Sequence, residues 1–200
     1  MTSAKERARQ IFKEHGGTLR TREALSAGIH PRTLYALRDV GELEQLARGL
    51  YRLAELPPLN DPDLATVAKR IPQGVICLIS ALAYHELTTQ VPHAVHVALP
   101  RTSRHPALEH PPLQVYRFSR EAFEAGVETK IIDDIAVRIY CPEKTLADCF
   151  KYRNKIGFDV AIEALRAYRA KRRRRLQKVL EYARICRVDN VMRPYLEAGA

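Results

Sequence analysis

Apolar residues in the first 40 positions recur at helical spacing in three short blocks. Ser3 and Glu6 have the spacing of a capping box at the start of the first block. Thr21 is the expected N-cap of the second block, and Gly28 ends it at a tight reversal of the chain. Pro31 suits the first turn of the third block, where its missing N–H costs nothing. Helices are therefore predicted over residues 4–15, 22–27 and 31–40.

A change of period follows the three helices. Residues 43–53 alternate around a turn at 47–49, which predicts a β-hairpin. Three short helices followed by a hairpin are the order of elements in a winged helix-turn-helix. The stiff, non-helical dipeptide Pro57-Pro58 marks the expected domain boundary. The predicted domains are a DNA-binding winged helix-turn-helix at 1–56 and a second domain at 57–200.

The remaining chain mixes apolar runs of strand length with amphipathic segments and shows no internal repeat. Strands are predicted at 74–79, 94–99, 113–118, 129–132 and 135–140, with Asp133-Asp134 as a turn. Helices are predicted at 63–70, after Ser80, from Pro142 to Tyr152, and in two amphipathic segments around 158–168 and 176–186. The fold class predicted is α+β: a winged helix-turn-helix followed by a mixed α/β domain that ends in amphipathic helices.

Composition excludes several classes of protein. With 46% hydrophobic and 28% charged residues among 200, the chain is neither disordered nor of low complexity. The longest apolar run, residues 74–79, is far too short to cross a membrane, and no apolar segment follows the charged N-terminus as a secretory signal requires. The four cysteines are scattered and without a Cys-x-x-Cys pair, which favours reduced thiols and a cytoplasmic location.

Basic charge is the first indication of a partner. The formal net charge is +10 and the pI about 9.7, values typical of proteins that bind nucleic acid. The excess is uneven along the chain. Residues 1–56 hold 10 basic and 7 acidic side chains, residues 57–150 hold 9 and 11, and residues 151–200 hold 14 and 5.

The third helix has the expected polarity of a recognition helix. Its spacing puts Leu34 and Leu37 on one face, and leaves Arg32 to contact guanine and Thr33 to contact a thymine methyl group or a phosphate. Side chains at the start of the second helix are placed for phosphates, and the hairpin tip for the backbone or the minor groove. A solvated helical mini-domain is the alternative. The predicted DNA-binding residues are Arg20, Thr21, Arg22, Arg32, Thr33, Tyr35, Arg38 and Arg48.

A second basic cluster lies near the predicted C-terminal helices. Consecutive arginines repel one another, and contact with a polyanion or an acidic partner would offset that cost. A solvated helix end is the alternative, because cations near a helix C-terminus are mildly favoured. The cluster is a candidate for binding either DNA or a protein partner: Arg169, Lys171, Arg172, Arg173, Arg174 and Arg175.

Signals for catalysis are weak. His93 and His96 lie beside a predicted strand, where residues three apart point to opposite faces, so a shared metal ion is not expected. The sequence contains no nucleophile elbow, phosphate-binding loop or dinucleotide fingerprint. The expectation is a protein without cofactor or catalytic residues. A nuclease or nucleotidyltransferase is the less favoured alternative.

Three blocks of the sequence form a pattern: Gly41 to Arg52 (GELEQLARGLYR), Ile79 to Leu87 (ISALAYHEL) and Val137 to Asp148 (VRIYCPEKTLAD). In this order they resemble the AbiEi family of antitoxins and transcriptional repressors of bacterial type IV toxin–antitoxin operons. The resemblance spans residues 5–190, but the Arg172–Arg175 cluster is denser than the family pattern.

The resemblance implies both a DNA partner and a protein partner. It implies a winged helix that binds inverted repeats in the operon's own promoter, and a C-terminal domain concerned with antitoxin activity against a nucleotidyltransferase-like toxin. The competing hypothesis is a protein-interaction module whose basic C-terminal helices hold an acidic partner, without sequence-specific DNA binding.

Overall fold

The computed structural model describes residues 3–172 and 174–198. The chain forms two compact units. The first extends to Pro72 and includes the hairpin tip Ile131–Ala136, and the second comprises Gln73–Lys130 and the chain from Val137 onward. Each unit has its own cluster of buried apolar side chains.

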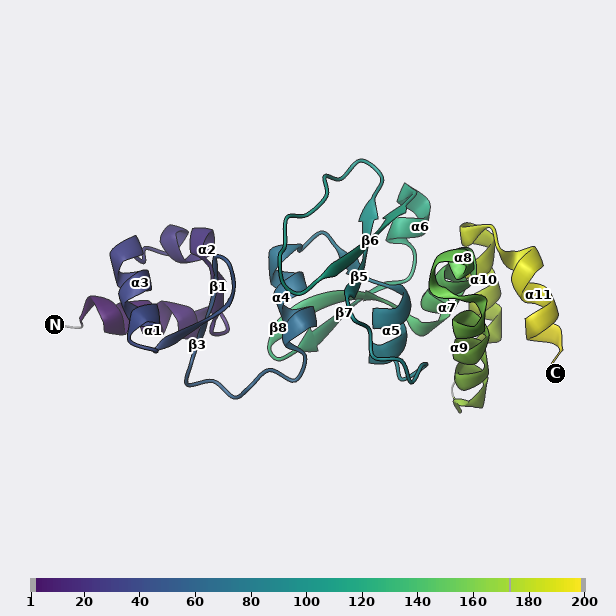
Figure 1. Cartoon of the computed structure of the whole chain (residues 1–200), viewed down its shortest axis with the longest axis horizontal. Helices are drawn as coiled ribbons and strands as arrows, with labels where there is room; N and C mark the ends of the chain where they lie inside the picture. The colour runs from purple at the N-terminus through teal and green to yellow at the C-terminus, as the bar shows by residue number, and fades with distance from the viewer. Residues whose placement is uncertain (1–2, 173, 199–200) are drawn as a thin grey trace. The chain divides into compact units, whose positions relative to one another are not determined.

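The first unit is a winged helix-turn-helix with a further helix. Its small sheet has the order β1-β3-β2, and both pairings are antiparallel. Figure 1 shows α1, α2 and α3 gathered against this sheet. The elements are α1 (Ala4–Glu14), β1 (Thr18–Arg20), α2 (Thr21–Ser26), α3 (Pro31–Asp39), β2 (Leu43–Ala47), β3 (Leu50–Leu53) and α4 (Pro62–Arg70).

Local chemistry accounts for most of these boundaries. Ser3 and Glu6 form the predicted capping box at the start of α1, since each side chain accepts a hydrogen bond from the other residue's backbone N–H. The apolar faces of the helices meet at Phe12, Leu34 and Leu37, all fully buried. The three helices and the hairpin predicted for this segment are confirmed.

The structure adds one strand to this unit and corrects one local prediction. Strand β1 was not predicted, because three residues are too few to show a period; its partner β3 determines it. Thr21 is the first residue of α2 and not its N-cap. Arg20 takes the cap position, where its N–H donates to the Glu23 carboxylate at 2.8 Å.

Helix α4 belongs to the first unit, beyond the boundary predicted at Pro57-Pro58. Lys69 Nζ donates to the carbonyl oxygen of Thr18 at 2.9 Å, and a guanidinium nitrogen of Arg70 donates to the carbonyl oxygen of Arg48 at 2.8 Å. Burial lowers the pKa of Lys69. These long side chains join α4 to the sheet. The Pro57-Pro58 break in the sequence gives no indication of these contacts.

The second unit is built on a five-stranded mixed sheet of order β6-β5-β4-β8-β7. Strand β4 pairs antiparallel with β5 and parallel with β8, and β5 pairs parallel with β6. Figure 1 shows the C-terminal helices α7 to α11 grouped together. The elements are β4 (Val75–Ile76), α5 (Leu78–Tyr84), β5 (Val95–Pro100), β6 (Leu113–Phe118), α6 (Arg120–Glu124), β7 (Val127–Ile132), β8 (Ile135–Tyr140), α7 (Pro142–Lys151), α8 (Arg153–Ile156), α9 (Phe158–Ala170), α10 (Leu176–Cys186) and α11 (Asp189–Glu197).

The predicted strand at 74–79 is wrong in length. Strand β4 has two residues, and α5 begins at Leu78 rather than after Ser80. Ser80 does not cap a helix; its Oγ accepts from the backbone N–H of His96 at 3.0 Å and so joins α5 to β5. The turn at Asp133-Asp134 is confirmed, with positive φ at both residues as a two-residue hairpin requires.

Three short helices of this unit were not predicted: α6, α8 and α11. The first two have five and four residues, too few for a helical period. Helix α11 contains Pro194, a residue that argues against a helix interior, yet its buried Met192 and Leu196 have helical spacing. The α+β class is confirmed despite these omissions.

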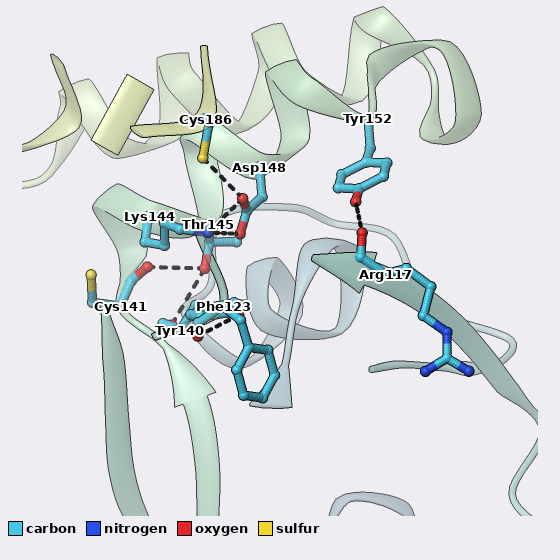
Figure 2. Close-up of polar contacts among 9 residues, drawn as sticks. All are labelled: Arg117, Phe123, Tyr140, Cys141, Lys144, Thr145, Asp148, Tyr152 and Cys186. Carbon is cyan, nitrogen blue, oxygen red and sulfur yellow. Dashed lines mark hydrogen bonds and ion pairs between the residues drawn. The ribbon is translucent and has the colours of Figure 1, made fainter. Parts of the chain in front are cut away.

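The core of the second unit contains a buried ion pair. Lys144 Nζ lies 2.6 Å from both carboxylate oxygens of Asp148, one turn later in α7, and both side chains are fully buried. Figure 2 shows Cys186 Sγ reaching the same carboxylate from α10, at 3.3 Å. The ammonium group also faces the rings of Tyr140 and Phe118, 4.2 and 4.9 Å from their centroids. Each buried charge therefore has a partner.

Candidate nucleic-acid interface

Helix α3 begins at a well-defined cap. The Nδ1 atom of His30 accepts from the backbone N–H of Arg32 at 3.2 Å, and Pro31 occupies the first helical turn. Gly28, with φ +94°, makes the reversal between α2 and α3 in a conformation that side chains rarely adopt. The direction of α3 is thus determined by its own N-terminal residues.

One face of α3 is buried and the opposite face is exposed. Leu34 and Leu37 are fully buried, whereas Tyr35 is 41% exposed and Arg32 is exposed. Thr33 lies half-buried at the edge. Among the described residues, the Arg32 side chain has no hydrogen-bond or ion-pair partner, so its planar guanidinium is available for a bidentate contact.

Arg38, on the same helix, is already engaged. Its guanidinium donates from Nε and Nη2 to one carboxylate oxygen of Asp39, at 2.9 and 2.6 Å, and lies 5.3 Å from the centre of the Tyr35 ring. The hydrogen bond to Asp39 raises the pKa of Arg38. Arg38 and Arg32 were both predicted to bind DNA. In the structure the charge of Arg38 is compensated by Asp39, whereas Arg32 has no partner among the described residues.

The hairpin predicted as the wing is present, and its turn is held from two sides. Gly49, with φ +72°, accepts at its carbonyl oxygen from the backbone N–H of Thr21 at 2.9 Å. Arg70 binds the carbonyl oxygen of Arg48 on the other side. Within the described chain the exposed Arg48 side chain has no partner. At the base of the hairpin, Arg52 is buried and paired with Glu44 at 3.0 Å.

The start of α2 offers fewer donors than predicted. The N–H groups of Arg20 and Thr21 are both occupied, by the Glu23 carboxylate and by Gly49. Arg20 Nε also lies 3.7 Å from Glu23. Arg22 is exposed and its side chain makes no ion pair among the described residues. Of the three predicted phosphate contacts, Arg22 is the one whose charge is uncompensated.

Comparison with known proteins agrees with this arrangement. Residues 6–54, from α1 to the end of the hairpin, match the sequence model of a family described as "Transcriptional regulator, AbiEi antitoxin". Residues 6–54, called the AbiEi segment below because of this match, are similar to that family. The AbiEi match contains all eight predicted DNA-binding residues.

No curated protein matches the chain. Among solved structures, the crystal structure of RV2827C protein from Mycobacterium tuberculosis is similar, with a TM-score of 0.57 and 15% sequence identity. The similarity covers 96% of this chain and 80% of that one, and it shows a shared fold that extends well beyond the AbiEi segment.

Outside the AbiEi segment, most of the predicted basic cluster is bound to the protein's own oxygen atoms. Arg175 Nε donates to the nearly buried Glu143 at 2.8 Å, and Tyr168 OH donates to the same oxygen at 2.7 Å. Burial alone raises the pKa of Glu143, but the hydrogen bonds from Tyr168, from its own backbone N–H and from Arg175, together with the Arg175 charge, outweigh burial and lower it. Arg175 therefore stabilises the connection between α9 and α10.

Other members of the cluster follow the same pattern. Lys171 donates to the carbonyl oxygen of His85 at 2.8 Å, Arg174 to that of Arg169 at 2.9 Å, and Arg169 to that of Tyr195 at 3.0 Å. Arg172 is exposed, and Arg173 lies outside the described residues. Their binding of DNA or of a partner stays a prediction.

Metal ligands, cysteines and membrane-spanning helices were the other features that the sequence raised. In the described part of the chain, no three His, Cys, Asp or Glu side chains are grouped to hold a metal ion. All four cysteines are buried and form no disulfide, and burial raises the pKa of each thiol. No described helix is long and apolar enough to span a membrane.

The sequence reasoning missed the residues that position the interface. His30 caps α3 through its side chain, and Arg70 holds the wing turn from α4. His30 directly precedes Pro31, a signal for a cap position. No local pattern indicates Arg70, since it acts across 22 positions of the chain.

Proposed function

We propose that this protein is a sequence-specific DNA-binding repressor and the antitoxin of a bacterial toxin–antitoxin operon, acting in the cytoplasm. In this proposal the winged helix-turn-helix binds inverted repeats in the operon's own promoter. The observation that carries the proposal is the exposed Arg32–Tyr35 face of α3, next to a hairpin whose tip is Arg48, in a segment that matches antitoxin transcriptional regulators.

The roles proposed for individual residues follow from their partners. Arg32 is unpaired and would contact a guanine through two hydrogen bonds, whereas Arg38 is neutralised by Asp39 and would contribute little. Arg22 and Arg48 would contact phosphates, which carry affinity but not sequence information. Tyr35 and Thr33 would complete the base-facing surface.

We therefore expect Arg32→Ala and Arg38→Ala to differ in their effect on DNA binding. Arg32→Ala should weaken binding to the upstream region by about 1–3 kcal/mol and relax base preference at one position of each repeat. Arg38→Ala should have a much smaller effect, because its charge is compensated by Asp39. Fluorescence anisotropy with the native and a scrambled upstream duplex measures both quantities.

Arg120→Ala is the matched control, since it removes the same charge from a side chain that is 90% exposed in the second unit. It should bind as the wild type does. Equal affinity of Arg32→Ala and wild type for the native duplex would contradict the assignment of α3 as the recognition helix. Equal affinity of the wild type for native and scrambled duplexes would favour the protein-interaction hypothesis instead.

The antitoxin role is proposed through the family. The partner would be a nucleotidyltransferase-like toxin from the neighbouring gene, and the function one of binding rather than catalysis. Growth rescue on co-expression of the two genes tests the role, and failure of rescue with a toxic neighbour would contradict it.

A further inference from the structure

A polar cavity of about 210 Å³ lies in the second unit, where the end of β6 meets α6, α7 and the end of α10. Asp148 and Cys186 line it on one side and Tyr152 on another. Figure 2 shows the Tyr152 hydroxyl directed at the backbone oxygen of Arg117, to which it donates a hydrogen bond. The two oxygen atoms are 3.0 Å apart, and this bond fixes the position of the ring. No part of the interface described above contributes to this cavity.

The cavity carries more positive charge than its surroundings balance. Arg101, Lys151 and Arg187 line it, all three are exposed, and within the described chain their side chains have no hydrogen-bond or ion-pair partner. Arg117 also lines it and donates one bond, to the carbonyl oxygen of Pro100 at 3.2 Å, which leaves its other N–H groups available. Like charges gathered without acidic partners repel, a cost that a bound anion removes.

The acidic groups of the cavity do not cancel this charge. The Asp148 carboxylate is neutralised by Lys144, which contacts both of its oxygens. Glu121 is the other acidic lining residue, and it forms no ion pair among the described residues. With Asp148 and Lys144 offset against each other, four cations face one carboxylate.

Arg187 adds an independent observation. It ends α10 in the left-handed conformation, with φ 58° and ψ 46°, where glycine is the favoured residue because other side chains crowd the backbone. The helix end itself is ordinary, closed by the Val188 N–H bond to the Ala183 carbonyl oxygen at 2.8 Å. Neither the left-handed turn nor the backbone hydrogen bond requires an arginine. The contribution of Arg187 is therefore its charged side chain, which lines the cavity.

We propose that this cavity binds the phosphate group of a small phosphomonoester. Arginine forks and a lysine point charge are the side chains that best match a dianionic phosphate. The volume is below the 300–1,000 Å³ typical of sites for drug-sized ligands, so the ligand is of about the size of a sugar phosphate. The aromatic wall at Tyr152 would contact its organic part.

The test is a binding titration of the full chain at constant ionic strength, followed by calorimetry and by amide chemical shifts. The probes are inorganic phosphate, ribose 5-phosphate and, as the uncharged comparison, ribose. We expect saturable binding of the two phosphates at one site and none of ribose. Arg101→Gln and Lys151→Gln should each weaken it by at least about tenfold, the effect of one charge-assisted hydrogen bond.

Three further variants make the result specific. Lys178→Gln removes the same charge from an exposed lysine in α10 outside the cavity and should bind phosphate normally. Glu121→Gln should tighten binding. Arg187→Gly should weaken binding while raising the thermal midpoint, because glycine suits the left-handed position and the protein stays folded.

The outcomes distinguish binding of a small phosphate ligand from binding of the DNA backbone. Saturable phosphate binding that is lost in the cavity variants and kept in Lys178→Gln supports the proposal. Absence of saturable phosphate binding in the millimolar range overturns it, as does an equal loss in Lys178→Gln. If Arg101→Gln and Lys151→Gln weaken duplex DNA binding but not phosphate binding, the cations belong to a DNA-binding surface and the proposal is also overturned.

Discussion

His96 and Tyr116 stack on neighbouring strands of the larger sheet, with ring centroids 5.4 Å apart. The His96 side chain is buried, its Nδ1 atom has no hydrogen-bond partner, and burial lowers its pKa to about 4. The folded protein therefore keeps this ring neutral under conditions in which the unfolded chain protonates it. At the scale of single residues, this is the clearest source of acid sensitivity in the second unit.

A pH-dependent loss of stability follows from His96. The folded pKa lies below the unfolded value of about 6.5, so the free energy of unfolding falls as pH drops from 6.5 to 4, by up to about 3 kcal/mol. His96→Phe keeps a ring on Tyr116 and should lose less stability over this range. Urea unfolding at pH 7 and pH 5 measures the difference, with His105→Gln at an exposed histidine as control. Parallel losses in His96→Phe and wild type would contradict the assignment.

At the scale of elements, α2, α4 and the β2–β3 hairpin act as one assembly in the first unit. The wing turn receives a backbone hydrogen bond from α2 and a side-chain hydrogen bond from α4. The position of Arg48 thus depends on two helices and not only on the hairpin. Since the turn has only two residues, a small shift at Gly49 moves Arg48 directly.

Gly49→Ala tests this dependence. Gly49 has φ +72°, and a Cβ atom added to it would lie 3.2 Å from the Thr21 hydroxyl oxygen. Gly41 has a similar φ of +76°, but a Cβ atom there would meet open space. We expect both alanine variants to lose about 1 kcal/mol of stability from backbone strain. Only Gly49→Ala should also weaken DNA binding, as measured by anisotropy. A similar loss of affinity in Gly41→Ala would show that strain alone explains the effect.

The sequence predicts an element well when it is long enough to show a period and when neighbouring residues determine it. Helix α3 was predicted because Leu34 and Leu37 repeat a helical period, and α1 because its cap is a four-residue motif. Strand β1 could not be predicted, since three residues show no period. The strand predicted at 74–79 was too long, because Leu78 has a positive φ and begins α5, which no local pattern indicates. The ion pair between Arg38 and Asp39 could have been predicted from the sequence, because the two residues are adjacent.

The phosphate cavity shows the limit of sequence reasoning more sharply. Its cations come from positions 101, 117, 151 and 187, which share no motif and meet only through the fold. The dense run at 172–175 was conspicuous by contrast, yet Arg174 and Arg175 mainly bind the protein itself. Charge density along a chain indicates which residues are basic; the tertiary structure decides which of them are unpaired.

At the scale of the whole molecule, DNA binding through the unpaired cations of this chain, whose net charge is +10, should depend strongly on salt. Only unpaired cations that contact phosphates displace counterions, so the slope of log affinity against log salt counts contacts and not total charge. Arg48→Ala should weaken binding to native and scrambled duplexes alike and reduce this slope by about one unit. An affinity series over salt concentration measures it, with Arg120→Ala as control. An unchanged slope in Arg48→Ala would place the hairpin tip away from the DNA.

The hydrogen bond from Thr21 to Gly49 has a practical consequence for chimeric regulators. A designer who transplants only the hairpin into a related scaffold would leave its donor behind, and Arg70 with it. The smallest portable cassette extends from residue 18 to residue 70, because that stretch contains both anchors and the third strand. Swaps that respect these limits should keep the tip in its native orientation, and shorter grafts should not.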